Sequence, residues 1–281
     1  MRQNEFVAVS TDKVLLVPYD RRHVLTYHGW MEDPAIQEAT ASERLTLEEE
    51  YENQESWRAS HDKMTFIVCQ PLPSLSSITN GSHSEPMLDP KTGRETIQAG
   101  IVDTPDKMVG DINLFLSPCE DDEEEEQHPP RNNTGVITKQ FVGEVDIMIA
   151  NAQNQGRGIG KAAVLAFLGY IGRHLGEILR EYYYQDQTDQ ESRLETKQQT
   201  VVKLELHSLV AKINQTNERS IALFKSLGFE QEGDGPNFFG EVKLVLPFAK
   251  FTTGFSNYSI SQAPPWYKEL GYVRAGEEGQ S

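Results

Sequence analysis

Apolar and polar residues alternate along the chain with two periods, one typical of β-strands and the other of α-helices. The clearest strand pattern covers 141–150, where apolar residues take every second position toward its end. One face of this segment consists of Val145, Ile147 and Ile149, and the other consists of Glu144, Asp146 and Met148. Further strands are predicted at 13–19, 64–69, 108–116, 201–210 and 238–246.

The strongest helix pattern follows directly after this strand. Apolar residues recur at helical spacing from Ile159 to Leu179, which predicts a long helix with one buried face. Thr46 and Glu49 form a T-x-x-E capping box, and this pair marks the start of another helix. A shorter helix is predicted at 217–227, where a glycine follows. Strands and helices mixed in this way predict an α/β fold.

Three segments show neither period and are rich in Ser, Pro, Gly, Gln or acidic residues. They cover about 71–107, 117–140 and 181–200, and we interpret them as disordered insertions. The patterned segments that remain have together the size of one ordinary domain. The sequence therefore predicts a single domain over 1–250, interrupted by three insertions, and a C-terminal tail over 251–281.

The charge of the chain bears on its partners. The formal net charge is −17, and seven consecutive acidic residues run from Glu120 to Glu126. Nucleic acids and anionic membranes are bound mainly through Lys and Arg, so we expect neither as a partner. The acidic run at 120–126 is typical of a solvated linker, and a basic partner for it stays open.

Neither a signal peptide nor an uninterrupted apolar stretch of 18 residues is found, so the chain is expected in the cytoplasm, with the nucleus left open. Cys69 and Cys119 are the only cysteines, which gives neither a disulfide framework nor zinc-ligand spacing. The histidines show no ligand spacing either, so no metal is predicted.

A glycine-rich segment, NQGRGIGKAAV at 154–164, joins the strand at 141–150 to the long helix. It is one residue too short between Gly156 and Gly160 for a P-loop, and Ala162 stands where that motif needs Ser or Thr. Its glycine spacing also differs from the dinucleotide-binding fingerprint. What remains is Gln155-x-x-Gly158-x-Gly160, which as a turn before a helix N-terminus can bind a phosphate or can serve as a connection alone.

This spacing resembles the acetyl-coenzyme A loop of the GNAT acetyltransferases, Q/R-x-x-G-x-G/A. The segment NERSIALFKSLGFEQEG at 217–233 resembles a later segment of the same superfamily. YHGWM (27–31), TASERLTLEEEY (40–51), DKMTFIV (62–68), VGDINLFL and GEVDIMIA are similar to the N-acetyltransferase 9-like group. The resemblance implies the GNAT fold, a central mixed, mostly antiparallel, twisted sheet flanked by helices.

Membership of this group implies transfer of an acetyl group from acetyl-CoA to an amine. The acceptors it suggests are protein or peptide N-termini, with those of tubulin among them. Two alternatives stay open: a small-molecule amine acetyltransferase, and a binding protein that keeps the fold without turnover.

The resemblance also assigns site residues. The loop residues that would hold the pyrophosphate of acetyl-CoA are Gln155, Gly156, Arg157, Gly158, Ile159, Gly160 and Lys161. Backbone groups of Met148, Ile149 and Ala150 would pair with the pantetheine arm and polarise the thioester. Asn217, Ser220 and Phe224 would complete the cofactor wall, although Asn217 is equally explained as a helix cap. Phe224 stands where many GNAT enzymes have a Tyr that protonates the departing thiolate.

Glu144 and Asp146 are the candidate general bases. They project from one face of a strand two residues apart, and neighbouring carboxylates can raise the pKa of one of them. Glu144 is the first choice, because related enzymes often carry their acid at the start of this strand. The alternative is a solvent-facing strand surface without a catalytic role.

Overall fold

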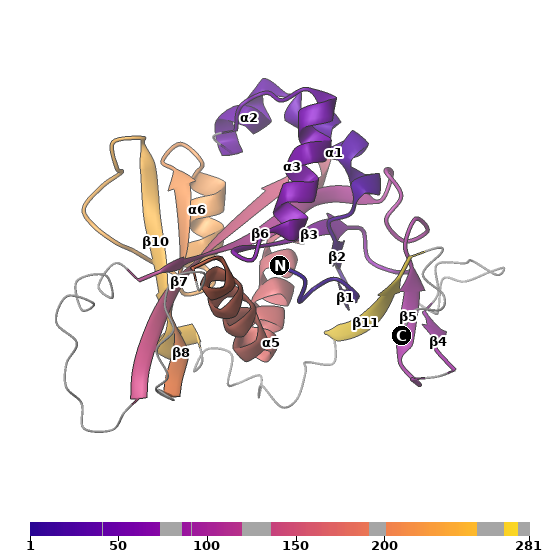
Figure 1. The fold of residues 1–281 in the computed structure, drawn as a ribbon. Helices are drawn as coiled ribbons and strands as arrows, with labels where there is room; N and C mark the ends of the chain where they lie inside the picture. Colours follow the sequence, from indigo (N-terminus) through magenta and orange to yellow (C-terminus); the bar gives the residue numbers. More distant parts are fainter. Residues whose placement is uncertain are drawn as a thin grey trace.

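The fold is described from a computed structural model of the chain, in which residues 1–40, 42–73, 86–90, 92–119, 136–190, 201–251 and 267–274 are placed well enough to describe. Its centre is an 11-stranded sheet in the order β4-β5-β11-β1-β2-β3-β6-β7-β8-β10-β9 (Figure 1). Two neighbouring pairs, β5 with β11 and β7 with β8, are parallel, and the remaining pairs are antiparallel. The expected mixed, mostly antiparallel sheet is thus confirmed.

The strands are β1 (Val7–Ser10), β2 (Leu15–Pro18), β3 (Lys63–Cys69), β4 (Met87–Leu88), β5 (Glu95–Gln98), β6 (Met108–Pro118), β7 (Val136–Ile149), β8 (Val201–Asn214), β9 (Glu230–Gln231), β10 (Glu241–Pro247) and β11 (Lys268–Val273). The helices are α1 (Val24–Met31), α2 (Pro34–Thr40), α3 (Leu47–Ala59), α5 (Ile159–Gln190) and α6 (Glu218–Lys225), with short 3₁₀ turns at Arg21–His23 and Ala152–Asn154. The predicted capping box is present at the start of α3, where Thr46 accepts from the Glu49 N–H.

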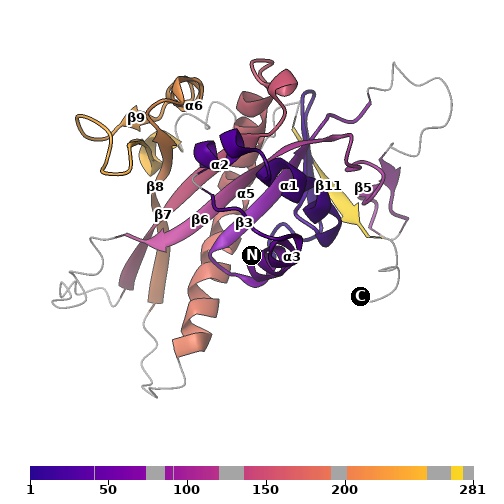
Figure 2. The same cartoon turned by 90° about the horizontal axis from the view of Figure 1, so that it is seen from above.

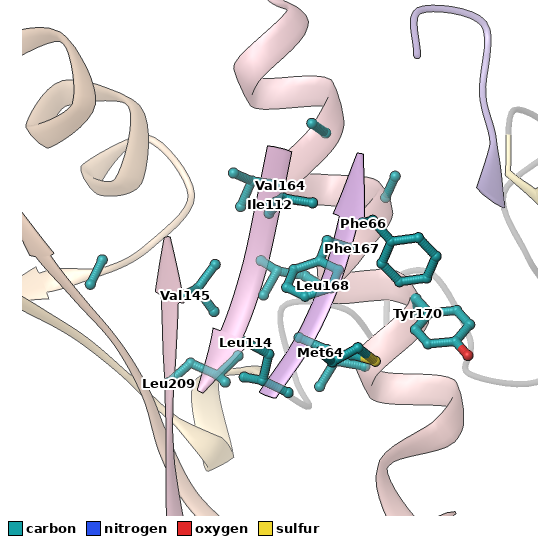
Figure 3. Packing of buried hydrophobic residues seen from close by; sticks show 14 of the residues in the cluster. Met64, Phe66, Ile112, Leu114, Val145, Val164, Phe167, Leu168, Tyr170 and Leu209 are labelled. Carbon is teal, nitrogen blue, oxygen red and sulfur yellow. The ribbon is translucent and has the colours of Figure 1, made fainter. Parts of the chain in front are cut away.

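One face of the sheet is covered by α5, whose apolar side chains pack on β3, β6 and β7. Phe167 and Tyr170 of α5 meet Phe66 of β3 edge to face, with ring centroids 5.9 and 5.2 Å apart (Figure 3). Ile112 and Val145 belong to the same buried cluster. Burial of this apolar face is the main driving force that fixes the sheet and α5 as one unit.

The opposite face of the sheet carries α1 and α3. Figure 2 looks down on this side and shows the two helices over β3, with β6, β7 and β8 following across the view. Tyr27 and Trp30 of α1 and Leu47 and Tyr51 of α3 pack against a second buried cluster there. The two faces of the sheet thus have separate cores, and Asp111, Asn113 and Asp146 lie on the side of α1 and α3.

Parts of the segments that we expected to be disordered form strands or helix. Part of the expected insertion at 71–107 forms β4 and β5, and Ile97 and Val102 are buried. Helix α5 runs to Gln190 into the expected insertion at 181–200. The expected tail contributes β11, which lies between β5 and β1 because its Leu270 and Tyr272 are buried. β5 and β11 have no clear periodicity because each is short and pairs with the other, far away in the sequence.

Two further differences concern segment ends. The expected insertion at 117–140 is shorter, since β6 ends at Pro118 and β7 begins at Val136, and the acidic run at 120–126 lies outside the described residues. The strand expected at 238–246 begins only at Glu241, because Phe238 and Phe239 lie exposed in the preceding turn.

Helix α5 is rich in apolar residues, although polar residues interrupt them. Within the described residues it is long enough, with a mean hydropathy of 1.3 over its best window, to cross a membrane by length and composition alone. A helix at the core of a globular domain meets the same criterion, and Val164, Phe167, Leu168 and Ile171 are buried against the sheet. The packing therefore accounts for this hydropathy.

Gly110 provides a test of the β6–β7 contact. A methyl group at Gly110 would lie 1.9 Å from the Met148 carbonyl oxygen on β7, so Gly110→Ala must push the strands apart. We expect it to lower the free energy of unfolding by about 3 kcal/mol, at the upper end for overpacking. Gly29→Ala in α1, where nothing lies within 4 Å, is the control and should stabilise by up to about 1 kcal/mol. Equal small effects in urea unfolding would contradict this packing.

Candidate active site

The site begins where the ladder between the parallel strands β7 and β8 ends. Pairing runs from Val136 with Val201, skips His207, and stops at Glu144 with Val210, although β7 continues to Ile149 and β8 to Asn214. On its other edge, β8 stays paired with β10 from Ser208 to Asn214. The edge of β7 over 145–149 that faces β8 therefore lies outside any ladder, and we call it the open edge.

Backbone alternation decides which groups point to the open edge. The Ala150 N–H donates to the Val109 carbonyl on β6, 2.9 Å away. Because strand residues alternate, Met148 also directs its backbone groups toward β6, and Ile147 and Ile149 direct theirs to the open edge. Of the three expected pantetheine partners, Met148 and Ala150 are thus turned away and only Ile149 fits. Ile147, which was not among the expected partners, also directs its backbone groups to the open edge. A period of two in the sequence does not say which strand lies on which side.

The glycine loop leads from the open edge into α5. Gly156 and Gly158 have φ of 69° and 79°, in the left-handed region that favours glycine. The N–H of Ala162 donates to the Gly158 carbonyl at 3.0 Å, so the N–H groups of the preceding residues 159–161 extend beyond the helix ladder. A methyl group at Gly160 would come within 3.2 Å of Leu223 on α6. This geometry suits an anion at the start of a helix of 32 residues.

Basic side chains surround the loop in an otherwise acidic chain. Arg157 and Lys161 are exposed in the loop. Lys13, from the turn before β2, reaches to 3.6 Å from where a Gly158 Cβ would lie. Arg219 donates to Gln155 Oε1 at 3.4 Å, and Gln155 Nε2 donates to the Ile149 carbonyl at 3.0 Å. Lys13 and Arg219 had no signal in the sequence, because both come from segments distant from the loop.

Helix α6 supplies the other expected cofactor residues with mixed results. Asn217 caps this helix, its Oδ1 accepting from the Ser220 N–H at 3.2 Å, as the capping alternative requires. Phe224, by contrast, is only 2% exposed and packs edge to face on Phe229, with ring centroids 5.1 Å apart. Phe224 is therefore packed in the core, and its expected contact with the cofactor stays a prediction.

The two candidate bases differ in environment. Glu144 accepts a hydrogen bond from Lys212 at 2.6 Å, and both side chains are partly exposed. Asp146 is more enclosed: burial, followed by the charges of Glu144 and Asp111, raises its pKa to about 7. A carboxyl group with a pKa near neutrality can both accept and release a proton at physiological pH. The structure thus favours Asp146 as the base, in place of Glu144.

A polar pair on β6 lies beside Asp146. Asn113 is directly opposite Asp146, and Asp111 is opposite Met148, all on the face covered by α1. Asp111 is 2% exposed, and burial raises its pKa to about 6. It accepts hydrogen bonds from Asn113 Nδ2 at 2.8 Å and from the Tyr27 hydroxyl at 3.5 Å. The signal for this pair was present in the sequence, as two polar residues on one face of the apolar segment MVGDINLFL.

The chain matches the family model for the acetyltransferase (GNAT) domain over residues 13–230. It is also similar along most of its length to curated proteins. An N-acetyltransferase 9-like protein of Schizosaccharomyces pombe is 35% identical over 252 residues, covering 88% of this chain and 98% of that protein. One of Caenorhabditis briggsae is 32% identical over 259 residues, covering 92% and 94%. The human protein called alpha/beta-tubulin-N-acetyltransferase 9 is 34% identical over 247 residues, covering 88% and 86%.

The raised pKa of Asp146 has a consequence for stability. In the unfolded chain an aspartate ionises near pH 3.9, whereas in the fold Asp146 holds its proton to about pH 7. The unfolded state therefore releases its proton first, so this residue makes the fold less stable as the pH rises from about 4 to about 7. Asn does not titrate. We therefore expect the Tm of Asp146→Asn, measured relative to wild type, to be higher at pH 8 than at pH 5.5.

The matched control is Asp234→Asn, at an exposed aspartate in the turn before β10. Its Tm relative to wild type should be the same at both pH values. If the Tm of Asp146→Asn relative to wild type is also the same at both pH values, Asp146 is not desolvated.

Proposed function

Because the chain belongs to the GNAT acetyltransferase family, we propose that it transfers the acetyl group of acetyl-CoA to the α-amine of a protein N-terminus. The observation that carries the choice of acceptor is the environment of Asp146, a carboxyl group with a pKa of about 7 beside the open edge of β7. An α-amine has a pKa near 7.7–8.0, so its proton can pass to such a base at small cost, whereas a lysine amine near 10.4 is far from matched.

The residues on both sides of the open edge fit acetyl-CoA. The loop from Gln155 to Lys161 offers backbone N–H groups at a helix N-terminus, with Lys13 and Arg219 close to it. The N–H groups of Ile147 and Ile149 would lie along the pantetheine arm and polarise the thioester carbonyl. When bound, acetyl-CoA supplies an activated acetyl group whose leaving group is a thiolate.

The chain's own part in the reaction is to handle a proton. Asp146 accepts one proton from the acceptor ammonium, and the neutral nitrogen then attacks the acetyl carbon. The bond from carbon to sulfur breaks, and the second proton that the nitrogen loses as the amide forms passes to solvent. The core position of Phe224 provides no hydroxyl to protonate the thiolate. A thiol has a pKa near 8.5, so its thiolate can leave without an acid.

The charges around Asp146 favour a cationic acceptor. Glu144, Asp111 and Glu241 all act on Asp146 electrostatically, and Lys212 opposes them. An incoming ammonium group would offset this excess of negative charge. The relatives named as tubulin N-acetyltransferases support a protein acceptor, and we propose the N-termini of α- and β-tubulin as substrates. We propose the cytoplasm as the compartment in which the protein acts.

The function is tested by the rate of acetyl transfer to peptides that copy the N-termini of α- and β-tubulin. We expect transfer to peptides with a free α-amine, and none when that amine is blocked and only a lysine is free. The rate should rise with pH up to about 7, as Asp146 ionises. Asp146→Asn should lower kcat by about 10²–10⁴-fold, the usual contribution of a general base, and Glu144→Gln should have a much smaller effect.

Acetylation of the lysine in the blocked peptide would contradict the choice of acceptor, and full activity of Asp146→Asn would contradict the role of Asp146.

Gly158→Asp tests the cofactor site separately. It forces a side chain into the left-handed conformation and adds a negative charge at the loop. This variant should lose the thermal stabilisation that acetyl-CoA gives to wild type, and Asp146→Asn should keep it.

A further inference from the structure

Asn113 of β6 is a buried side chain whose hydrogen bonding is incomplete. It is 6% exposed and lies directly opposite Asp146 on the neighbouring strand. Residues opposite each other in an antiparallel pair have Cβ atoms about 4.5–5.5 Å apart and project to the same face of the sheet. Asn113 is therefore the neighbour of the proposed base.

The orientation of the Asn113 amide is fixed from one side. Its Nδ2 donates to Asp111 Oδ2 at 2.8 Å, and Asp111 also accepts from the Tyr27 hydroxyl at 3.5 Å. A carboxylate accepts and does not donate, so Asp111 pairs with the nitrogen of the amide and not with its oxygen. The carbonyl oxygen of Asn113 then points away from Asp111.

In the part of the chain that the structure describes, this Oδ1 is buried and has no hydrogen-bond partner. A buried acceptor without a donor is unfavourable, and such atoms are rare in folded proteins. The group that completes the site must therefore be a donor, and it must reach the α1 side of the sheet beside Asp146. The acidic surroundings of Asp146 favour a donor with positive charge.

We propose that Asn113 Oδ1 accepts a hydrogen bond from the acceptor amine and positions its nitrogen beside Asp146, an inference that rests on the function proposed above. An ammonium group has three N–H donors, so one can bind Asn113 while another passes its proton to Asp146. After that transfer the neutral amine still donates to Asn113, which leaves its lone pair free to attack the acetyl carbon. Asp111 and Tyr27 act through Asn113, as positioning residues.

The test is Asn113→Leu, which has a similar size and cannot accept a hydrogen bond. With the free α-amine peptides we expect the acceptor KM to rise about tenfold, the equivalent of one lost hydrogen bond to a charged group. The thermal shift with acetyl-CoA should stay as in wild type, because the glycine loop is untouched. If Asn113→Leu does not fold, Asn113→Ala carries the same expectation.

The matched control is Thr65→Val. Thr65 is buried and lies opposite Asn113 on β3, in the same row but one strand further from Asp146. This change also removes a polar group of nearly constant size, and the acceptor KM should not change. If Asn113 had only a structural role, its replacement would lower the Tm or change the KM of both substrates alike. It would not change the acceptor KM alone.

The two proposals fail in different ways. A wild-type enzyme that acetylates α-amine peptides, together with an unchanged acceptor KM in a folded Asn113→Leu variant, would overturn the role of Asn113 and leave the function standing. A wild-type enzyme that binds acetyl-CoA and does not acetylate any α-amine peptide would overturn the function and, with it, the role of Asn113.

Discussion

The site depends on a single structural constraint, the point at which β7 and β8 stop pairing. Both strands continue beyond Glu144 and Val210, but β8 is held by β10 while β7 is held by β6. Backbone N–H and C=O groups need partners, so an edge left open between two held strands is a position for a ligand. The glycine loop and α5 follow directly from this edge, and the carboxylates stand on its α1 side.

Asp146 shows how the position on the sheet sets the chemistry. Glu144 and Asp146 have the same kind of side chain on the same face of one strand, yet Lys212 pairs with Glu144 and burial acts on Asp146. Burial disfavours the charged carboxylate, and the nearby negative charges add to this effect. The residue with the strongest electrostatic partner is therefore not the one suited to accept a proton near pH 7.

The sequence was sufficient for the fold class and the glycine loop, because alternation at 141–150 and helical spacing after Ile159 are local signals. It did not rank Glu144 and Asp146, since the ranking depends on Lys212 from β8 and on the desolvation of Asp146 in the folded sheet. It also missed β11, whose short pattern has meaning only beside β1. Local periodicity predicts elements, whereas the order of strands, the burial of a charge and an unfilled hydrogen bond are properties of the assembled sheet.

The most direct test of the account is the pKa of Asp146, measured by carbon-13 NMR of aspartate-labelled protein with Asp146→Asn to assign the signal. We expect a carboxyl group that titrates near pH 7 in the folded enzyme. A value near 3.9, that of an unperturbed aspartate, would show that Asp146 is solvated and would contradict its role as the base.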